Sequence, residues 1–267
     1  MSDIKIPKVI HYCWFGKNEK PDIVKKCIAS WKKYCSDWEI KEWNEDNFDV
    51  TSIPYMKEAY EAKKWAFVSD VARLLIIYQS GGVYLDTDVE VLQSINTLLD
   101  NEAFFAFETG RNINTGMGFG SVKEHAVVKE MIRYYNDKHF FKNGKEQLFL
   151  CPAGNTEALI NYYPEFIRNG CGQFFAGIRI LSGAEYSVYA KHYGTASWVN
   201  NPQIKKSKFH ASKIKAILRN HNIFEWIESK FGKKAVSWYT LLVYDFLDFG
   251  LGYFVKRQFV KLVNRKR

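Results

Sequence analysis

The sequence predicts an α/β protein in which a central sheet is covered by helices, and two patterns support this prediction. First, a short apolar run at 8–15 is followed by a helical pattern at 21–34 and by a second strand-like run at 38–43. Second, a long helical pattern at 56–79 leads through a glycine pair into another apolar run at 83–85. A strand, helix, strand order is typical of parallel strands in layered α/β folds.

The helices of the first half have clear signals. After Pro21, apolar residues recur at helical spacing with lysines between them, which predicts an amphipathic helix that covers the sheet. The helix at 56–79 is apolar on almost every side in its second half, apart from Ser69, Asp70 and Arg73, so we expect that half to be buried. Gly81-Gly82 ends the helix, because glycine tolerates the left-handed conformation of a C-terminal cap.

The second half contains weaker patterns. We predict strands at 103–107 and 174–181 and helices at 124–135 and 156–163. From about 236, aromatic and aliphatic residues alternate until a cluster of six basic residues fills 256–267 without any acidic one. We therefore divide the chain into a main domain at 1–235 and an aromatic and basic helical tail at 236–267.

Much of the formal charge of +9 lies in that tail. The basic residues are not interleaved with aromatic ones as in a groove for nucleic acid, so we expect no nucleic-acid partner. Asp245 and Asp248 argue against a membrane-spanning segment at 235–255, because two carboxylates near a bilayer centre are costly. The tail instead predicts peripheral contact with an anionic membrane, and packing of the tail on the main domain is the open alternative.

The cysteines bear on the compartment. There are five, an odd number, and they are scattered without any C-x-x-C pair. This spacing indicates neither a disulfide framework nor a zinc cluster and favours a reducing compartment. With the basic tail, it predicts a cytoplasmic protein at the inner face of the cell membrane.

Two aspartates, Asp86 and Asp88, follow the apolar run at 83–85. Ligands of open α/β sheets bind at the carboxyl ends of strands, and carboxylates suit a hard cation such as Mg²⁺ or Mn²⁺. Asp70 and Arg73 share a helix face and are costly groups in an apolar segment. They form either a structural ion pair or part of a site, and we expect all four side chains to converge on one pocket.

These motifs resemble the signature of glycosyltransferase family 32, which includes bacterial capsule-type and yeast mannosyltransferase-like enzymes. The resemblance rests on Ser69-Asp70-x-x-Arg73, on 81–88 with its D-x-D, and on the opening stretch at 6–16. The large clostridial glucosylating toxins have a similar arrangement. It covers roughly the first 120 residues and implies a GT-A-type nucleotide-sugar-binding fold, with a mixed central sheet flanked by helices and a C-terminal amphipathic helical extension.

The resemblance also implies roles around the donor. Trp14 corresponds to an aromatic residue stacked on the nucleotide base. Asp70 corresponds to a residue that binds ribose or sugar hydroxyls, and Arg73 to one that approaches the donor sugar and its diphosphate. Tyr84 reaches the donor, and Asp86 contacts the donor sugar or ribose and acts on the metal indirectly.

Further residues are implied for the metal and for the diphosphate. Asp88 is the expected direct metal ligand. Asn114 resembles an asparagine that meets the donor sugar, although the glycine-rich residues after it depart from the commoner pattern. The segment from His192 through Ser197 to Trp198 resembles a late segment that closes over the diphosphate, where His192 ligates the metal or binds phosphate.

The function implied is that of a retaining, metal-dependent glycosyltransferase. It would move a hexose or N-acetylhexosamine from a nucleotide sugar, with uridine diphosphate as the expected carrier, to a hydroxyl of a polysaccharide or lipid-linked acceptor in bacterial surface glycan synthesis. A covalent intermediate would need a carboxylate beside the anomeric carbon, for which Glu108 and Asp70 are the candidates. Direct front-face transfer is favoured by the resemblance.

Two other functions remain open. An apolar strand followed by D-x-D is also typical of haloacid-dehalogenase-type phosphatases, in which the first aspartate is the nucleophile. In that family the motif usually lies on the first strand, whereas here another strand and a long helix come before it. The second alternative is a non-catalytic protein that binds a membrane surface through its basic tail, with a structural acidic pair.

Overall fold

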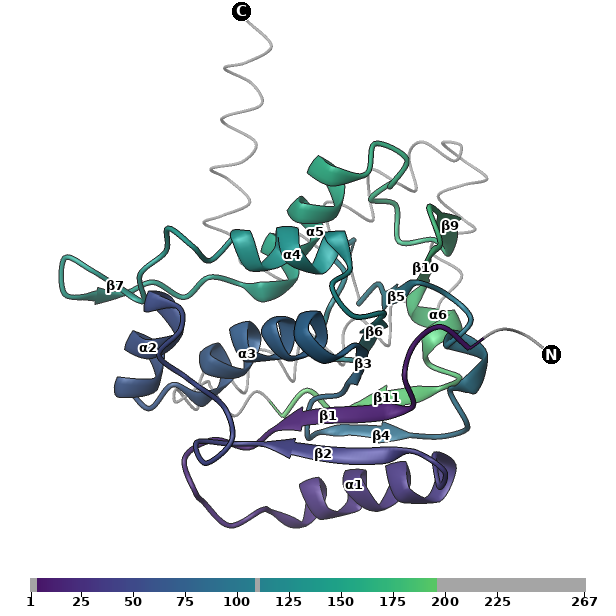
Figure 1. The fold of residues 1–267 in the computed structure, drawn as a ribbon, viewed down its shortest axis with the longest axis horizontal. Helices are drawn as coiled ribbons and strands as arrows, with labels where there is room; N and C mark the ends of the chain where they lie inside the picture. Colours follow the sequence, from purple (N-terminus) through teal and green to yellow (C-terminus); the bar gives the residue numbers. More distant parts are fainter. Residues whose placement is uncertain (1–3, 109–110, 196–267) are drawn as a thin grey trace, which may run out of the picture. The chain divides into compact units, whose positions relative to one another are not determined.

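The computed structural model describes residues 4–108 and 111–195 (Figure 1). The predicted tail at 236–267 and the boundary before it lie outside the described residues. The described elements are, in chain order, β1 (Val9–Cys13), α1 (Asp22–Tyr34), β2 (Glu39–Trp43), α2 (Pro54–Glu61), α3 (Trp65–Ser80), β3 (Gly82–Tyr84), β4 (Val89–Val91), a 3₁₀ turn (Asn96–Leu98), β5 (Ala103–Ala106), β6 (Phe119–Ser121), α4 (Ala126–Arg133), β7 (Phe141–Lys142), β8 (Lys145–Glu146), α5 (Cys151–Tyr162), β9 (Gln173–Phe175), β10 (Ile178–Leu181), α6 (Gly183–Tyr186) and β11 (Ala190–His192).

A seven-stranded sheet forms the centre, in the order β2-β1-β3-β6-β5-β10-β9. β1 is parallel to β2 and to β3, and β5 is parallel to β10. β6 lies antiparallel between β3 and β5 and joins the two parallel halves. This is the mixed sheet of the predicted GT-A-type fold, so the predicted fold class is confirmed.

Both faces of the sheet are buried, and the strand period of two assigns alternate side chains to two cores. Ile10 and Tyr12 of β1 pack in one core, whereas Cys13 packs in the other. Phe104 and Phe105 of β5 divide in the same way. Such strands appear in the sequence as nearly continuous apolar runs, which is why they could be predicted.

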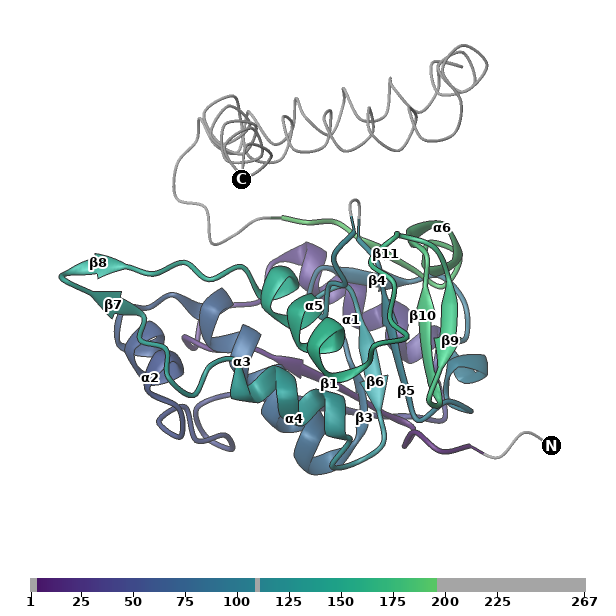
Figure 2. The same cartoon turned by 90° about the horizontal axis from the view of Figure 1, so that it is seen from above.

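The helices cover the two faces separately (Figures 1 and 2). α1 contributes Cys27 and Trp31 to the core that contains Ile10. On the opposite face, α2, α3, α4 and α5 pack together in the core that contains Phe105. None of the helices in the described ranges has the length and apolarity needed to cross a bilayer.

The helix predicted at 56–79 is two helices, so the predicted single helix is wrong. α2 ends at a turn in which Lys63 has a φ of 57°. The Lys63 N–H donates to the Tyr60 carbonyl, and the Lys64 N–H donates to the Ala59 carbonyl, both at 2.9 Å. These two bonds are the Schellman pattern of a helix end, which usually has glycine where Lys63 stands. The absence of that glycine hid the break from the sequence.

The strand predicted at 174–181 is likewise wrong in extent, because it is a hairpin of β9 and β10. The two residues between these strands, Ala176 and Gly177, have φ values of 46° and 75°. Positive φ at both positions is typical of the type I′ turn, whose twist matches that of the flanking strands. Alanine at the first position weakens the turn signal in the sequence.

His11 on β1 fixes the glycine turn before β3. Its ring nitrogens contact the Gly81 carbonyl at 3.0 Å and the Trp43 indole N–H at 3.0 Å. Because the indole N–H donates, the Nδ1 atom of His11 must accept, so both bonds require a neutral ring. Burial lowers the His11 pKa to about 4, although the bond to Gly81 acts in the opposite direction.

We therefore predict an acid-sensitive contribution of His11 to stability. The pKa of His11 is about 4 in the folded protein, against a model value of 6.5, so the unfolded chain binds more protons between these values. The free energy of unfolding should fall by about 3 kcal/mol through this group as pH falls across that window. Denaturant unfolding of wild type and His11→Gln across the window should give curves that converge at low pH, and parallel curves would contradict the assignment.

Candidate active site

The D-x-D aspartates lie where β3 ends. β1, β2 and β3 are parallel, so their carboxyl ends meet at one edge of the sheet. The Asp86 N–H donates to the Gly116 carbonyl at 3.0 Å, and the Val89 N–H donates back to the Asp86 carbonyl at 3.0 Å. The first bond ties Asp86 to the loop between β5 and β6, and the second closes a tight turn between β3 and β4 that carries both carboxylates.

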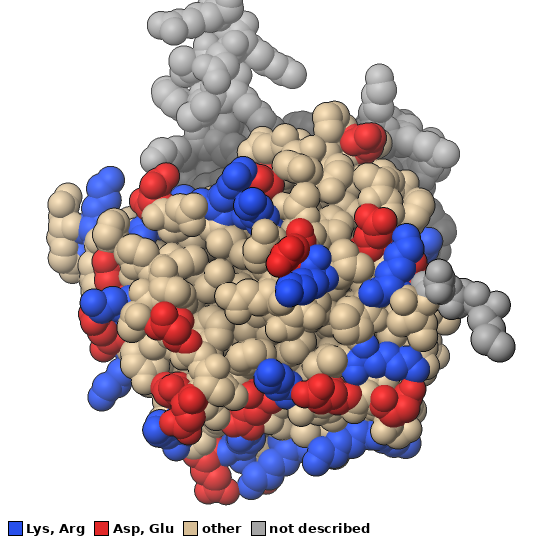
Figure 3. Space-filling model, in the orientation of Figure 1, with Lys and Arg blue, Asp and Glu red and all other residues tan. Residues whose placement is uncertain are grey.

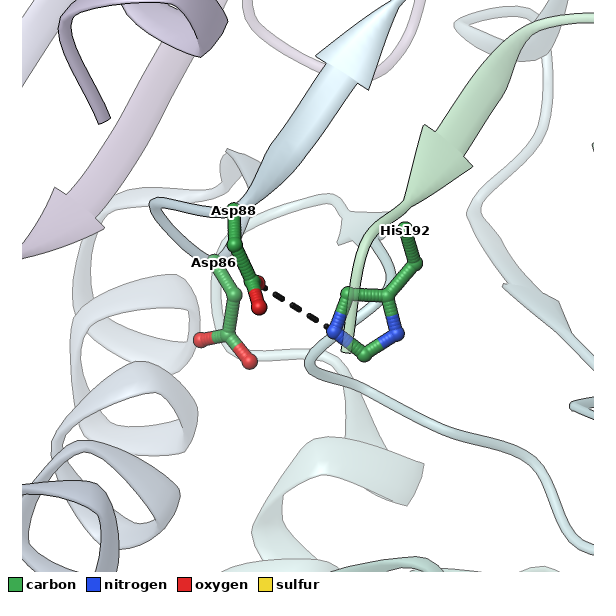
Figure 4. A group of neighbouring side chains, drawn as sticks. All are labelled: Asp86, Asp88 and His192. Atoms are coloured by element: carbon green, nitrogen blue, oxygen red, sulfur yellow. Dashed lines mark ion pairs between the residues drawn. The ribbon is translucent and has the colours of Figure 1, made fainter. Parts of the chain in front are cut away.

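His192 reaches the same turn from a distant part of the chain. β11 pairs antiparallel with β4, and His192 lies opposite Val89, the residue that follows Asp88. His192 Nε2 is 3.2 Å from Asp88 Oδ1, and one ligand atom from each of Asp86, Asp88 and His192 lies within 4.8 Å of the others. Figure 4 shows His192 facing the two carboxylates from the end of β11.

Asp88 is the strongly ionised member of the group. Burial acts to raise its pKa, but the hydrogen bond and charge of His192 and two bonds from Thr195 outweigh burial and lower it to about 2. The Thr195 backbone N–H and hydroxyl donate to Asp88 Oδ2 at 2.8 and 2.9 Å. Burial also lowers the His192 pKa, and the contact with Asp88 outweighs it, so the net shift is upward.

Arg73 on α3 links the helix to the D-x-D turn. Its Nη2 atom lies 2.8 Å from Asp70 Oδ1 and 3.2 Å from Asp86 Oδ1. Its Nε–H donates to the Ser69 carbonyl at 3.0 Å, and its guanidinium carbon lies 5.0 Å from the Tyr84 ring centroid. The Tyr84 hydroxyl donates to Asp86 Oδ1 at 3.1 Å. The four predicted residues thus converge as expected, and Tyr84 joins them.

The charges of this group do not balance. Burial raises the Asp70 pKa to about 6, although Arg73 counteracts it. Burial likewise raises the Asp86 pKa, with Arg73 opposing and the charge of Asp88 adding to the rise. Three carboxylates share one guanidinium and one imidazole in a largely buried space, which favours a bound cation. Carboxylate oxygens and an imidazole nitrogen together fit Mn²⁺ or Mg²⁺, with the nitrogen favouring Mn²⁺.

Asn114 lies in the loop between β5 and β6, close to these groups. Its Oδ1 atom accepts a bond from the Gly116 N–H at 2.8 Å. A Cβ atom on Gly116 would lie 2.3 Å from Asp86 Oδ2, 2.7 Å from Arg73 Nη1 and 3.1 Å from Asn114 Oδ1. A larger residue at this position would therefore displace Asp86 and Arg73.

Trp14 stands at the same sheet edge, just beyond β1. Its indole N–H donates to the Asn18 carbonyl at 2.8 Å, and the Lys20 ammonium lies 5.7 Å from its ring centroid. Trp14 borders a hollow of about 210 Å³ lined mainly by polar side chains, among them Glu42 and Asn44. The structure gives Trp14 a position beside the hollow, and its stacking role remains a prediction.

Two predicted residues, Ser197 and Trp198, lie outside the described ranges. Glu108 is described, and its Oε1 atom lies 4.0 Å from His192 Nδ1. Glu108, the first candidate for forming a covalent intermediate, therefore lies next to the group of Asp86, Asp88 and His192. Asp70, the second candidate, is held by Arg73.

Sequence reasoning missed a buried polar group that reaches Asp70 through Cys151. Thr115 and Asn155 are fully buried, and the Asn155 amide donates to the Thr115 hydroxyl at 2.9 Å. Asn155 also lies 3.1 Å from Cys151 Sγ, and Cys151 in turn neighbours Asp70. Thr195, which holds Asp88, was missed as well. No local pattern marks Asn155 or Thr195, because α5 also has exposed polar residues such as Glu157.

We predict that Arg73 contributes strongly to stability. Arg73→Gln leaves Asp70 and Asp86 facing each other without their shared cation, so the free energy of unfolding should fall by about 3–5 kcal/mol in metal-free buffer. Arg133→Gln on α4 is the control, because it breaks an ion pair to Glu130 at the surface. Denaturant unfolding of both variants checks this, and similar losses for the two would contradict it.

The comparisons with known proteins agree with the site. Residues 21–105 match the family described as the glycosyltransferase sugar-binding region containing the DXD motif. Inositol phosphoceramide mannosyltransferase 3 of Schizosaccharomyces pombe is 31% identical over 147 residues, which are 51% of this chain and 40% of the relative. Mannosyltransferase 2 of the same organism is 25% identical over 209 residues, 73% of this chain and 59% of the relative. The chain spans about half the length of the curated relatives it matches.

Two solved structures are also similar. The PaToxG glycosyltransferase is 17% identical, with a TM-score of 0.46 over 60% of this chain and 70% of that one. A glycosyltransferase involved in glycosylation of the major capsid of PBCV-1 is 12% identical, with a TM-score of 0.40 over 72% and 95%. The family match and the relatives confirm the resemblance seen in the sequence: residues 21–105 are a glycosyltransferase sugar-binding region with a DXD motif, and they support assignment of the chain to the transferases.

Proposed function

We propose that the chain transfers a hexose or N-acetylhexosamine from a nucleotide sugar to a hydroxyl group, with a divalent cation and with retention of anomeric configuration. The observation that carries this proposal is the group of Asp86, Asp88 and His192, which adjoins the guanidinium of Arg73. A cation ligand set beside a buried arginine suits a diphosphate, whose oxygens bind both. Uridine diphosphate is the proposed carrier.

The roles of the side chains follow from their contacts. Asp88 and His192 hold the cation directly, and Thr195 orients Asp88 through its two hydrogen bonds. When bound, the cation neutralises the charge that develops on the departing diphosphate. Arg73, held by the Ser69 carbonyl and by Asp70, supplies a fixed positive charge for the same oxygens. Asp86 and Asn114 present oxygens toward the donor sugar.

Front-face transfer is the mechanism that we propose. A covalent intermediate needs a carboxylate free to attack the anomeric carbon. Asp70 is engaged by Arg73, and Glu108 lies 4.0 Å from the imidazole of His192. The remaining contributions, orientation of the two substrates and stabilisation of the leaving diphosphate, are those that this group of residues can supply.

For the acceptor, we propose a lipid-linked glycan or glycolipid. The similar yeast proteins are named as mannosyltransferases of inositol phosphoceramide, which is a lipid. Mannose lies within the predicted hexose class. A role in bacterial surface glycan synthesis and a place at the cytoplasmic face of the cell membrane stay predictions.

We predict that uridine diphosphate binding requires both Mn²⁺ and Asp88. Asp88→Asn removes a metal ligand charge, so binding measured by titration calorimetry with Mn²⁺ should weaken at least about 100-fold. Binding of uridine diphosphate to wild-type protein without Mn²⁺ should be weaker by a similar factor. Asp137→Asn, a change to an exposed aspartate just after α4, is the matched control and should bind as wild type.

Two outcomes would count against this proposal. If uridine diphosphate binds equally well with and without Mn²⁺, the cation has no role in donor binding. If folded wild-type protein binds neither uridine diphosphate nor guanosine diphosphate, the proposal of a nucleotide-sugar donor is wrong. Phosphatase activity lost in Asp86→Asn would then favour the haloacid-dehalogenase alternative.

We also predict that Gly116→Ala impairs donor use without unfolding the protein. The new methyl group would displace Asp86 and Arg73, which lie 2.3 and 2.7 Å from its position. A displacement of about 1 Å in such a site costs about 100-fold in rate. Gly183→Ala is the control, because its methyl group would meet only the Phe107 carbonyl, at 3.2 Å. Donor hydrolysis or transfer and thermal unfolding of both variants check this, and wild-type rates for Gly116→Ala would contradict it.

A further inference from the structure

The hairpin of β7 and β8 projects from the body of the protein beside α2 (Figure 2). Its base is fixed, because Glu58 of α2 accepts a bond from the Phe141 N–H at 3.1 Å and pairs with His139 at 2.6 Å. The Tyr55 hydroxyl donates to the Gln147 carbonyl at 3.2 Å. The hairpin is therefore held in one orientation, and the direction of its side chains is defined.

Apolar side chains alternate between the core and the solvent in the residues that begin and follow this hairpin. Phe140 is fully buried and Phe149 packs on the core. Phe141, Leu148 and Leu150 instead point outward and are 42%, 48% and 47% exposed. Three large apolar side chains presented to water, one on the hairpin and two on the segment that follows it, are a typical mark of an interaction surface.

The tip of the hairpin is basic. Lys142 and Lys145 are directly opposite each other across the two strands, and both are exposed. Like charges in opposite positions destabilise a hairpin. Among the described residues neither lysine has an ion pair, whereas the acidic Glu146 is neutralised by Lys64 at 2.9 Å. In Figure 3, blue and uncharged side chains lie at the left edge, where β7 projects in Figure 1, with red side chains next to them.

We propose that the segment 141–150, which consists of the hairpin and the four residues after it, docks the protein on an anionic lipid bilayer. Two unpaired lysines complement anionic head groups, and the three apolar side chains enter the boundary between head groups and acyl chains. A narrow projecting tip suits a bilayer surface, into which it can insert without a matching groove. The segment runs directly into α5, whose first residue, Cys151, neighbours Asp70.

The test places an environment-sensitive dye at the tip of the hairpin in the full chain. Asn143→Cys combined with Cys171→Ser gives one accessible thiol, because the other four cysteines are buried. Wild type labelled at its exposed Cys171 is the position control. On addition of vesicles of phosphatidylglycerol and phosphatidylcholine, the emission of the hairpin dye should shift to the blue, and that of the Cys171 dye should not.

Further variants in the labelled background resolve the two contributions. Leu148→Ser with Leu150→Ser should abolish the blue shift, whereas Ile167→Ser with Phe174→Ser, at exposed apolar positions outside the segment 141–150, should leave it unchanged. The double variant Lys142→Ala with Lys145→Ala should need up to about 30-fold more lipid to reach half of the full blue shift. Each lysine contributes about fivefold to the affinity for anionic lipid. Thermal unfolding confirms that each variant is folded.

Three results would overturn the proposal. The first is an unchanged hairpin dye while the protein floats with anionic vesicles, which would assign binding to another segment. The second is an equal shift with pure phosphatidylcholine and with anionic vesicles. The third is a shift that depends on protein concentration without vesicles, which would identify the surface as a contact between copies of the chain. Nucleotide binding measured without vesicles tests the proposed sugar transfer separately.

Discussion

The buried guanidinium of Arg73 is the interaction on which the site depends. It joins Asp70, one turn away on the same helix, to Asp86, which arrives after the strand that follows. A charge in such a place is tolerated only when its partners are in position, so the ion pairs fix the angle between α3 and the D-x-D turn. Asp86 is held by Arg73, whereas Asp88, within the same ligand group, is held by His192 and Thr195.

Much of the fold was predictable because both faces of its sheet are buried. Strands such as β1 and β5 are continuous apolar runs, and α1 has a regular apolar stripe, so local sequence was sufficient for them. The errors have a common cause. Lys63 and Ala176 adopt positive φ without being glycine, so the turns that they form lack the usual signal. β4, β6 and β11 have only three residues each and are defined by their partners rather than by their own pattern.

The residues of the site likewise divide into those that could be predicted from the sequence and those that could not. Asp70, Arg73, Tyr84, Asp86 and Asp88 lie within one helix, turn and strand, so their convergence could be expected from spacing alone. His192 was identified only through a family resemblance, because its contact with Asp88 depends on pairing between β4 and β11. Thr195 and Asn155 act through contacts between distant segments, which leave no trace in local sequence.

The pairing of β4 with β11 has a consequence for how the site assembles and opens. The contact between Thr195 and Asp88 closes a loop of 107 residues, whereas Arg73 and Asp86 meet within one local unit. Contacts that close long loops form late in folding and are available for local opening when the strand that makes them is short. Detachment of β11 alone would release His192 and Thr195 from Asp88 together and leave Asp86 under Arg73. The arginine half of the site is thus held within one local unit of the fold, whereas the histidine half depends on the pairing of two short strands that are distant in the sequence.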